Sequence, residues 1–261
     1  MSEVEFQIIK SIGFVIALVA VVGLQRLLPH AGQEGSWRLN GGLWALNAVI
    51  LGIVCAGCAC TVSRWAETEG FGLLNRLDMT NGWLAIPVAV FVLDGVSYFW
   101  HRANHRISLL WRFHQVHHSD PNFTATTAIR FHFGELLLAL PVRLFAVAVM
   151  GVSIPGVIVF ELIFAFANFF EHGDIDLPLD LERRLAFFFI TPALHRRHHS
   201  LEAALLNSNY GTIFSFWDRI FRSFGGSGSD VQVQIGLPGV SEVLGAQAAL
   251  MMPIRGIYRG R

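Results

Sequence analysis

Eight of the eleven histidines fall into three clusters whose spacing fits one face of a helix. The first cluster has two histidines four residues apart, and the other two repeat the spacing i, i+3, i+4. Side chains at these separations lie close together on a helix, so the imidazoles of one cluster can converge on one point. The clustered residues are His101, His105, His114, His117, His118, His195, His198 and His199. Neutral imidazole binds Fe, Zn, Cu or Ni, and eight imidazoles exceed what one ion can use, so the pattern predicts two metal ions that share a site.

Two polar residues precede the first cluster on the same helical stripe. Asp94, Tyr98, His101 and His105 stand at i, i+4, i+7 and i+11, which places them on one face. An ionisable side chain inside an apolar segment is a functional candidate, and a carboxylate there can accept the second ring N–H of a ligand histidine. We predict Asp94 and Tyr98 as catalytic residues. The alternative for Asp94 is a structural role, as a cap or as the partner of a nearby arginine.

The composition indicates that these residues belong to a membrane protein. Only 15% of the 261 residues are charged, whereas 53% are hydrophobic, and the mean hydropathy is +0.51. A soluble domain carries roughly 25% charged residues. This balance, with a net charge of zero, excludes a disordered chain, a nucleic-acid-binding protein and an ordinary cytosolic enzyme.

Four apolar stretches are long enough to form membrane segments, since about 20 residues cross the hydrocarbon core. Residues 6–28 read as a retained anchor, residues 39–63 carry no charge, and residues 79–100 carry only Asp94. Residues 136–170 read as a helical hairpin, either short-spanning or re-entrant. We predict an all-α integral membrane helical bundle of about four to five membrane segments, with a cytosolic helical cap that holds the His-rich di-metal site.

The polar regions set the expected domain organisation and orientation. Residues 1–225 should form a single membrane-embedded catalytic domain, with the histidines in regions 101–135 and 171–225. Residues 226–261 should form a flexible tether and a C-terminal segment on the membrane surface. Arginine gathers in the polar regions, so the positive-inside rule places the site on the cytoplasmic side and the N-terminus outside. His30 is expected on the opposite side of the membrane, away from the site.

The three cysteines form the string Cys55-Ala-Gly-Cys58-Ala-Cys60, which has the appearance of a redox or zinc motif. The string lies inside the predicted segment 39–63, where apolar surroundings keep thiols inert. We interpret these cysteines as small residues for helix packing. The chain has no Gly-rich nucleotide loop, haem motif or iron–sulfur set of cysteines, so electrons for a redox reaction must come from another protein.

Four strings in residues 80–225 closely resemble the fatty acid hydroxylase/sterol desaturase superfamily. They read Asp94-Gly-Val-Ser-Tyr98-Phe-Trp-His101-Arg102-Ala-Asn-His105, Trp111-Arg-Phe-His114-Gln-Val-His117-His118-Ser119, Thr191-Pro-Ala-Leu-His195-Arg-Arg-His198-His199-Ser200, and Asn209-Tyr210-Gly211 followed by Phe214-Ser215-Phe216-Trp217-Asp218-Arg219. The resemblance implies a membrane enzyme with two iron ions held by histidines, for which zinc can substitute in purified protein. It also implies O2 as cosubstrate and electrons from a separate NAD(P)H-linked donor, such as a ferredoxin, a cytochrome b5-like protein or a reductase.

The resemblance adds two histidines to the predicted metal ligands. His172 stands where the apolar hairpin returns to the polar region, a position where family members place a ligand. His132, in Arg130-Phe-His132-Phe-Gly-Glu135, falls in a string that usually reads His-Pro in the family. It is either a ligand or a residue that orients one.

The predicted function is O2-dependent di-iron hydroxylation of a lipid C–H bond at the surface of a bacterial inner membrane. The lipid is of the fatty acyl, sterol or isoprenoid type. A lipid desaturase with the same centre is the alternative, because both reactions share the first hydrogen abstraction. A metal-binding or transport protein without catalysis fits less well, because transporters place polar ligands near the bilayer midplane, whereas these histidines lie at helix ends and beyond.

Overall fold

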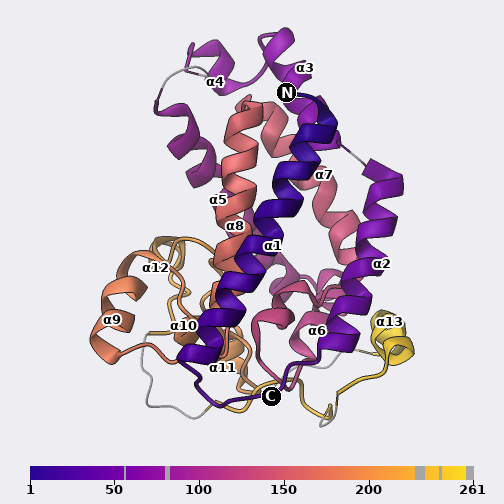
Figure 1. Ribbon diagram of the computed structural model, residues 1–261, viewed down its shortest axis with the longest axis vertical. Helices are drawn as coiled ribbons and strands as arrows, with labels where there is room; N and C mark the ends of the chain where they lie inside the picture. The colour runs from indigo at the N-terminus through magenta and orange to yellow at the C-terminus, as the bar shows by residue number, and fades with distance from the viewer. Residues whose placement is uncertain (56, 80–82, 227–232, 241–242, 257–261) are drawn as a thin grey trace.

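Across the residues that the structure describes, the protein is a bundle of helices without extended strands, as the sequence predicts. The computed structural model describes residues 1–55, 57–79, 83–226, 233–240 and 243–256. The helices are α1 (Glu3–Leu27), α2 (Trp37–Cys55), α3 (Cys58–Thr68), α4 (Leu73–Arg76), α5 (Ala85–Arg106), α6 (Ser108–His118), the 3-10 turn η1 (Ala125–Ile129), α7 (Phe133–Met150), α8 (Ile154–His172), α9 (Leu179–Phe188), α10 (Pro192–His198), α11 (Ala203–Leu206), α12 (Phe216–Ile220) and α13 (Ala246–Arg255). Helices α1, α2, α5, α7 and α8 run roughly along the long axis of the molecule (Figure 1).

The outer faces of the long helices are apolar, as lipid contact requires. On α1, Ile12, Val15, Ile16 and Val19 are all more than half exposed. A helix that is hydrophobic on every face is either deeply buried or surrounded by lipid. Four stretches of the described residues are long and apolar enough to cross a membrane, namely Glu3–Leu27, Trp37–Arg76, Phe133–Met150 and Ile154–His172.

Local sequence signals explain where several of these helices begin. Ser2 and Glu5 form a reciprocal capping box at the start of α1, which satisfies two backbone N–H groups that a helix start leaves unpaired. Between α7 and α8, Gly151 adopts a left-handed conformation and Ser153 caps the next helix. The predicted hairpin 136–170 is therefore two antiparallel helices, each long enough to span.

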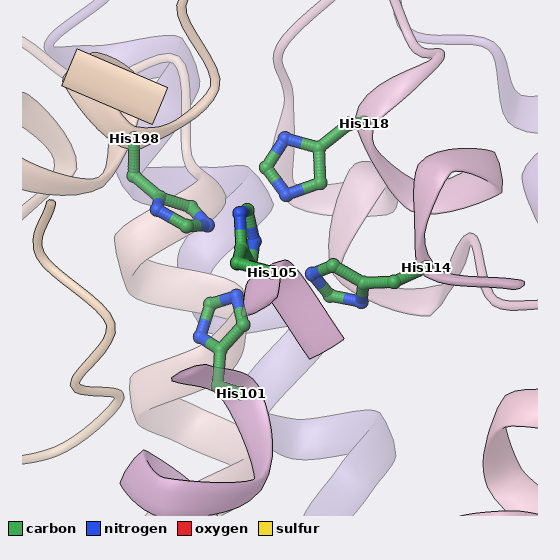
Figure 2. Close-up of side chains that lie close together, drawn as sticks. All are labelled: His101, His105, His114, His118 and His198. Carbon is green, nitrogen blue, oxygen red and sulfur yellow. The ribbon is translucent and has the colours of Figure 1, made fainter. Parts of the chain in front are cut away.

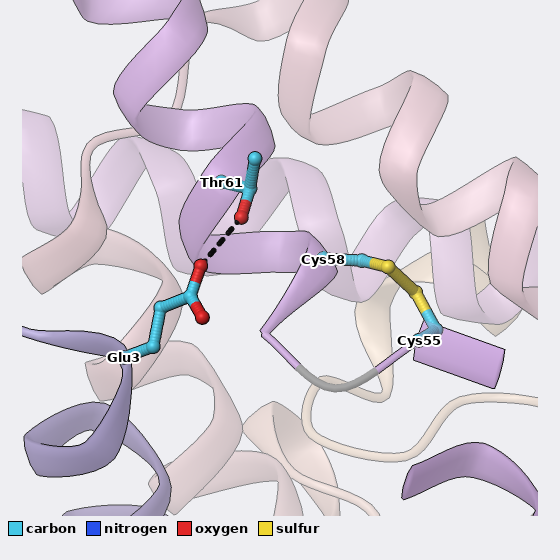
Figure 3. The surroundings of a disulfide bond; sticks show 4 residues. All are labelled: Glu3, Cys55, Cys58 and Thr61. Atoms are coloured by element: carbon cyan, nitrogen blue, oxygen red, sulfur yellow. Dashed lines mark hydrogen bonds between the residues drawn. A yellow bond between two sulfur atoms is a disulfide. The ribbon is translucent and has the colours of Figure 1, made fainter. Parts of the chain in front are cut away.

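The predicted segment 39–63 lies within the candidate span Trp37–Arg76, but it is not one continuous helix, because the helix breaks in its middle. Helix α2 ends at Cys55 and α3 begins at Cys58, after Gly57 in a left-handed conformation. Cys55 and Cys58 form a disulfide across this break (Figure 3). The interpretation of the cysteines as packing residues therefore fails for these two and holds only for Cys60, which is buried and free.

Helix α5 departs from the predicted segment 79–100 in a way that matters for the site. It begins at Ala85 and continues to Arg106, so its last turns carry the first histidine pair. Residues 80–82 lie outside the described residues. Helix α5 is not among the four candidate spans, because its C-terminal half is polar. It packs against α8, with Val90 and Leu93 in the same core cluster as Val157 and Phe160.

The two ends of the bundle have different contents. The N-terminus, α3 and α4 lie at one end, where the hydroxyl of Thr61 donates to Glu3 at 2.8 Å (Figures 1 and 3). Helices α6, α10 and α11 lie at the other end together with the last turns of α5 and α8 (Figure 1). His30 also lies at that end, because its N–H donates to the Asp174 carbonyl oxygen at 3.1 Å. Its predicted position on the opposite side of the membrane is wrong.

Helix α13 packs on the outer side of the histidine-bearing helix α6. A guanidinium nitrogen of Arg112 donates to the Pro253 carbonyl at 3.1 Å, and Met252 is buried in the same cluster as Val116. The predicted tether falls mostly on residues 227–232, which lie outside the described residues. That the C-terminal segment rests on a membrane surface stays a prediction.

Candidate metal centre

Five histidines from three helices converge at the polar end of the bundle. Helices α5 and α6 each contribute two, and α10 contributes one. They are His101, His105, His114, His118 and His198, and one nitrogen of each lies within 4.8 Å of one nitrogen of every other. Figure 2 shows the five rings facing a common centre. All except His101 are buried.

Four further histidines form a second group of the same kind. His117, His172, His195 and His199 come from α6, α8 and the end of α10, and all four are buried. His172 Nε2 lies 3.0 Å from the Nε2 atoms of both His117 and His195. Two nitrogens bound at right angles to one ion at about 2.1 Å would be separated by about 3.0 Å. This spacing therefore suits shared coordination.

The two groups divide each HxxHH string between them, whereas the sequence analysis expected each string to converge on one point. On α6, His114 and His118 belong to the five-histidine group and His117 to the four-histidine group. On α10, His195 and His199 belong to the second group and His198 to the first. Successive residues point about 100° apart on a helix, so one string can serve two neighbouring ions. The His118 and His199 rings stack across the boundary with centroids 4.2 Å apart.

The donor atoms of both groups are chemically ready for metal ions. The Nε2 atoms of His101, His105, His114 and His198 are buried without a hydrogen-bond partner. Burial, followed by the neighbouring imidazoles, lowers the pKa of His117, His118, His195 and His199 well below its ordinary value. These rings are therefore neutral, with lone pairs available. An unpaired buried nitrogen costs free energy, and a bound ion would remove that cost.

Backbone carbonyl oxygens around the groups lie close to the Nδ1 atoms of three of these histidines. His101 Nδ1 lies 2.9 Å from the Tyr210 carbonyl oxygen and His198 Nδ1 lies 2.7 Å from that of Ser208. His172 Nδ1 lies 2.7 Å from the Asn168 carbonyl oxygen. Such contacts fix the tautomer and present Nε2 to the metal.

Two buried carboxylates also lie beside the candidate ligands, and neither was predicted as a site residue from the sequence. Glu135 lies 2.9 Å from His114 Nδ1 and accepts from Asn104 at 3.0 Å. Glu171 lies 3.7 Å from His172 Nδ1 and 3.6 Å from His195 Nδ1. Each stands within three residues of a histidine that was singled out, which was the available signal.

A cavity of about 260 Å³ extends from the histidines into the bundle. Its polar end includes His101, His114, His117, His172 and His195. Its walls are mostly apolar and come from α2, α5, α7 and α8, with Leu51, Leu93, Val96, Leu136, Leu140 and Phe164 among them. An apolar chain could reach the histidines through this space.

Comparison with known proteins identifies the family. The family model for fatty acid hydroxylases matches residues 86–223, more than half of the chain. The chain belongs to the fatty acid hydroxylase family. The match begins at the start of α5 and ends just after α12, so it contains every histidine of both groups.

Three relatives illustrate the range of the family. Ornithine lipid hydroxylase OlsE of Rhizobium tropici is 32% identical over 159 residues, covering 60% of this chain and 45% of that protein. Alkylglycerol monooxygenase of Danio rerio is 31% identical, covering 54% of this chain and 30% of that protein. Cholesterol 25-hydroxylase of Rattus norvegicus is 22% identical, covering 61% and 53%. The chain thus spans about half the length of these relatives or less, and no solved structure matches it.

Within this hydroxylase-family site, Asp94 and Tyr98 lie outside the ligand groups. Asp94 accepts from the backbone N–H groups of Ile213 and Phe214 and from the Trp217 indole, at 2.9 to 3.2 Å. Tyr98 shares a 2.7 Å hydrogen bond with the Ser223 hydroxyl. This geometry argues against the predicted contact of Asp94 with a ligand histidine. Asp94 instead positions the segment at Ile213 and Phe214. This segment follows Tyr210, and the Tyr210 carbonyl oxygen contacts His101 Nδ1.

The structure separates His132 from both groups. Its Nδ1 accepts the Gly134 N–H at 2.9 Å as the N-cap of α7, and its Nε2 lies 3.2 Å from the Leu250 carbonyl oxygen. One ring nitrogen therefore accepts and the other donates, which leaves no lone pair for a metal. This arrangement argues against a ligand role, and it places His132 at the contact between α7 and α13.

Proposed function

We propose that this protein is an O2-dependent di-iron hydroxylase that inserts oxygen into a C–H bond of a lipid. The observation that carries the proposal is the apolar cavity that ends on two adjacent groups of histidines, eight of them buried. Its relatives are lipid hydroxylases and monooxygenases by name. When bound, two iron ions would supply the O2 activation that an unactivated C–H bond requires.

The residues of the chain would prepare the site in three ways. The nine histidines would hold the ions, and the carbonyls of Ser208 and Tyr210 would keep His198 and His101 in the tautomer that presents Nε2. The apolar walls would exclude water and guide a chain toward the ions. Glu135 would orient the His114 ring, because its carboxylate lies 2.9 Å from His114 Nδ1.

The four-histidine group would be the side on which the substrate reacts. Three of its members, His117, His172 and His195, line the cavity, compared with two of five in the other group. A catalytic metal keeps one position free of protein ligands, and the group with fewer histidines leaves more room for it. The electrons would come from a separate NAD(P)H-linked protein.

The orientation in the membrane follows from the two ends of the bundle. Disulfides persist in oxidising compartments and are rare in the cytosol, which favours an outward-facing end at Cys55 and Cys58 and a cytoplasmic end at the histidines. Single cysteines at the exposed positions Glu67 and Glu202 test this in intact bacterial cells. An impermeant maleimide should label the first and not the second, and the reverse pattern would invert the assignment.

The reaction is tested with membranes, an electron donor and 18O2. One 18O atom in a new lipid hydroxyl is the expected result. A product two hydrogens lighter and free of 18O would instead identify a desaturase. Absence of any O2-dependent lipid product from protein loaded with two iron ions would rule out the enzyme.

A further inference from the structure

Three charged side chains form a cluster among the membrane-spanning helices. The Glu161 carboxylate on α8 lies 3.0 Å from Lys10 Nζ on α1 and 3.3 Å from a guanidinium nitrogen of Arg143 on α7. Two cations thus share one anion among the described residues. Ionisable side chains are costly in the hydrocarbon region and usually mark a function there.

Arg143 belongs both to this cluster and to the wall of the cavity. Along α7 the cavity is lined from Glu135 to Arg143, eight residues or about 12 Å of helix. Glu135 contacts His114, so Arg143 marks the end of the cavity that is remote from the histidines. The cavity therefore has a polar metal-binding end, mostly apolar walls and a cationic far end.

The contacts of Arg143 leave its guanidinium able to bind an anion. Its side chain is 35% exposed and packs over the Phe160 and Phe164 rings at 5.2 and 5.6 Å. Glu161, its acidic partner among the described residues, is divided between Arg143 and Lys10. A guanidinium carries five N–H donors in a planar fork that suits carboxylate and phosphate oxygens.

We propose that Arg143 binds an anionic group of the substrate, a carboxylate or a phosphate, and thereby sets which carbon reaches the histidines. This inference rests on the proposed function and specifies its substrate as an anionic amphiphile. The cavity of about 260 Å³ holds roughly nine groups the size of water, at about 30 Å³ each. This volume suits one segment of an alkyl chain.

Equilibrium dialysis of the protein in phosphatidylcholine nanodiscs tests this site without iron or a donor. The probes are radiolabelled decanoate, decyl phosphate and the uncharged decan-1-ol, each corrected for uptake by empty nanodiscs. The wild-type protein should bind at least one anionic probe about 10-fold or more tighter than decan-1-ol, as a hydrogen bond to a charged group provides. The preferred anion distinguishes a carboxylate substrate from a phosphate.

Variants separate anion binding from a purely structural ion pair. Arg143→Gln should weaken binding of the preferred anion by about 10- to 100-fold, whereas Glu161→Gln should retain or strengthen it, because Arg143 loses its competitor. The double variant Arg143→Gln with Glu161→Gln removes the guanidinium together with its carboxylate partner and should not bind the anion, which keeps the test valid if Arg143→Gln fails to fold. Equal losses in Arg143→Gln and Glu161→Gln, or no preference for an anion in the wild type, would overturn the proposal.

The two proposals can fail independently. Arg143-dependent anion binding without any O2-dependent product would remove the hydroxylase and leave the anion site. A hydroxylated lipid product that forms equally well in wild type and Arg143→Gln, with unchanged anion binding, would remove the anion site and leave the hydroxylase.

Discussion

The five-histidine and four-histidine groups differ in how firmly their members are held. In the first, His101, His114 and His198 each have an outer partner at 2.7 to 2.9 Å. In the second, His172 has one at 2.7 Å, and the Glu171 carboxylate lies 3.6 to 3.7 Å from two rings. The looser group also faces more of the cavity. One chain therefore builds two neighbouring histidine groups from nearly identical sequence strings and gives the rings of one group more close outer contacts than those of the other.

Removal of one histidine from each group should have the largest effect. His117→Ala and His198→Ala should each abolish turnover and lower the metal content from about two ions per chain to about one, because each belongs to a different group. Elemental analysis and the 18O2 assay measure the two outcomes. Two bound ions with full activity in the double variant would contradict the division into two groups.

The carboxylate that lies nearer to a candidate ligand histidine should matter more for metal binding and activity. Glu135→Gln removes the charge 2.9 Å from His114 and should lower metal affinity or activity by about 10- to 100-fold, as loss of an outer partner typically does. Glu171→Gln acts over longer contacts and should cost less. Metal titration of both variants, with the exposed Glu202→Gln as control, checks the order of their metal affinities. A larger loss of metal affinity in Glu171→Gln than in Glu135→Gln would reverse the assignment of the more firmly held group.

Asp94 should affect stability more than metal binding. The carboxylate accepts three hydrogen bonds, and the single acceptor oxygen of Asp94→Asn leaves at least one donor unpaired, at about 1–3 kcal/mol. Thermal unfolding should therefore shift to lower temperature, with metal affinity changed less than in Glu135→Gln. A metal loss as large as that of a ligand variant would instead restore Asp94 to the site.

His132→Asn should have the smallest effect of the series. Asparagine is a good N-cap residue, so it can replace His132 Nδ1 as the acceptor at the start of α7. Metal content should stay at about two ions per chain, with a small loss of stability from the missing contact to Leu250. Loss of one ion in this variant would make His132 a ligand after all.

Much of this molecule could be predicted from local sequence. The long helices follow from apolar runs of membrane length, and the division of the hairpin follows from Ile154-Pro155-Gly156, which the structure places in the first turn of α8. The nine converging histidines follow from helical spacing and from the family resemblance. These properties are periodic or compositional, so they can be recognised in the amino-acid sequence alone.

Tertiary structure decided which histidines work together. Helical spacing brings His114, His117 and His118 to the same side of α6, but the partners from α5, α8 and α10 divide them between two groups. The same holds for Asp94 and His132, whose positions beside candidate ligands suggested a metal-related role. Their hydrogen bonds to Ile213 and Leu250, 119 and 118 residues away, depend on how the chain folds back.

The charged cluster at the far end of the cavity was likewise decided by packing. Lys10, Arg143 and Glu161 each appear in the sequence as an isolated interruption of an apolar run. Only the packing of α1 and α7 against α8 makes them one cluster with two cations and one anion. A sequence determines which side chains a helix carries, whereas the partner of a side chain depends on contacts between residues that are distant along the chain.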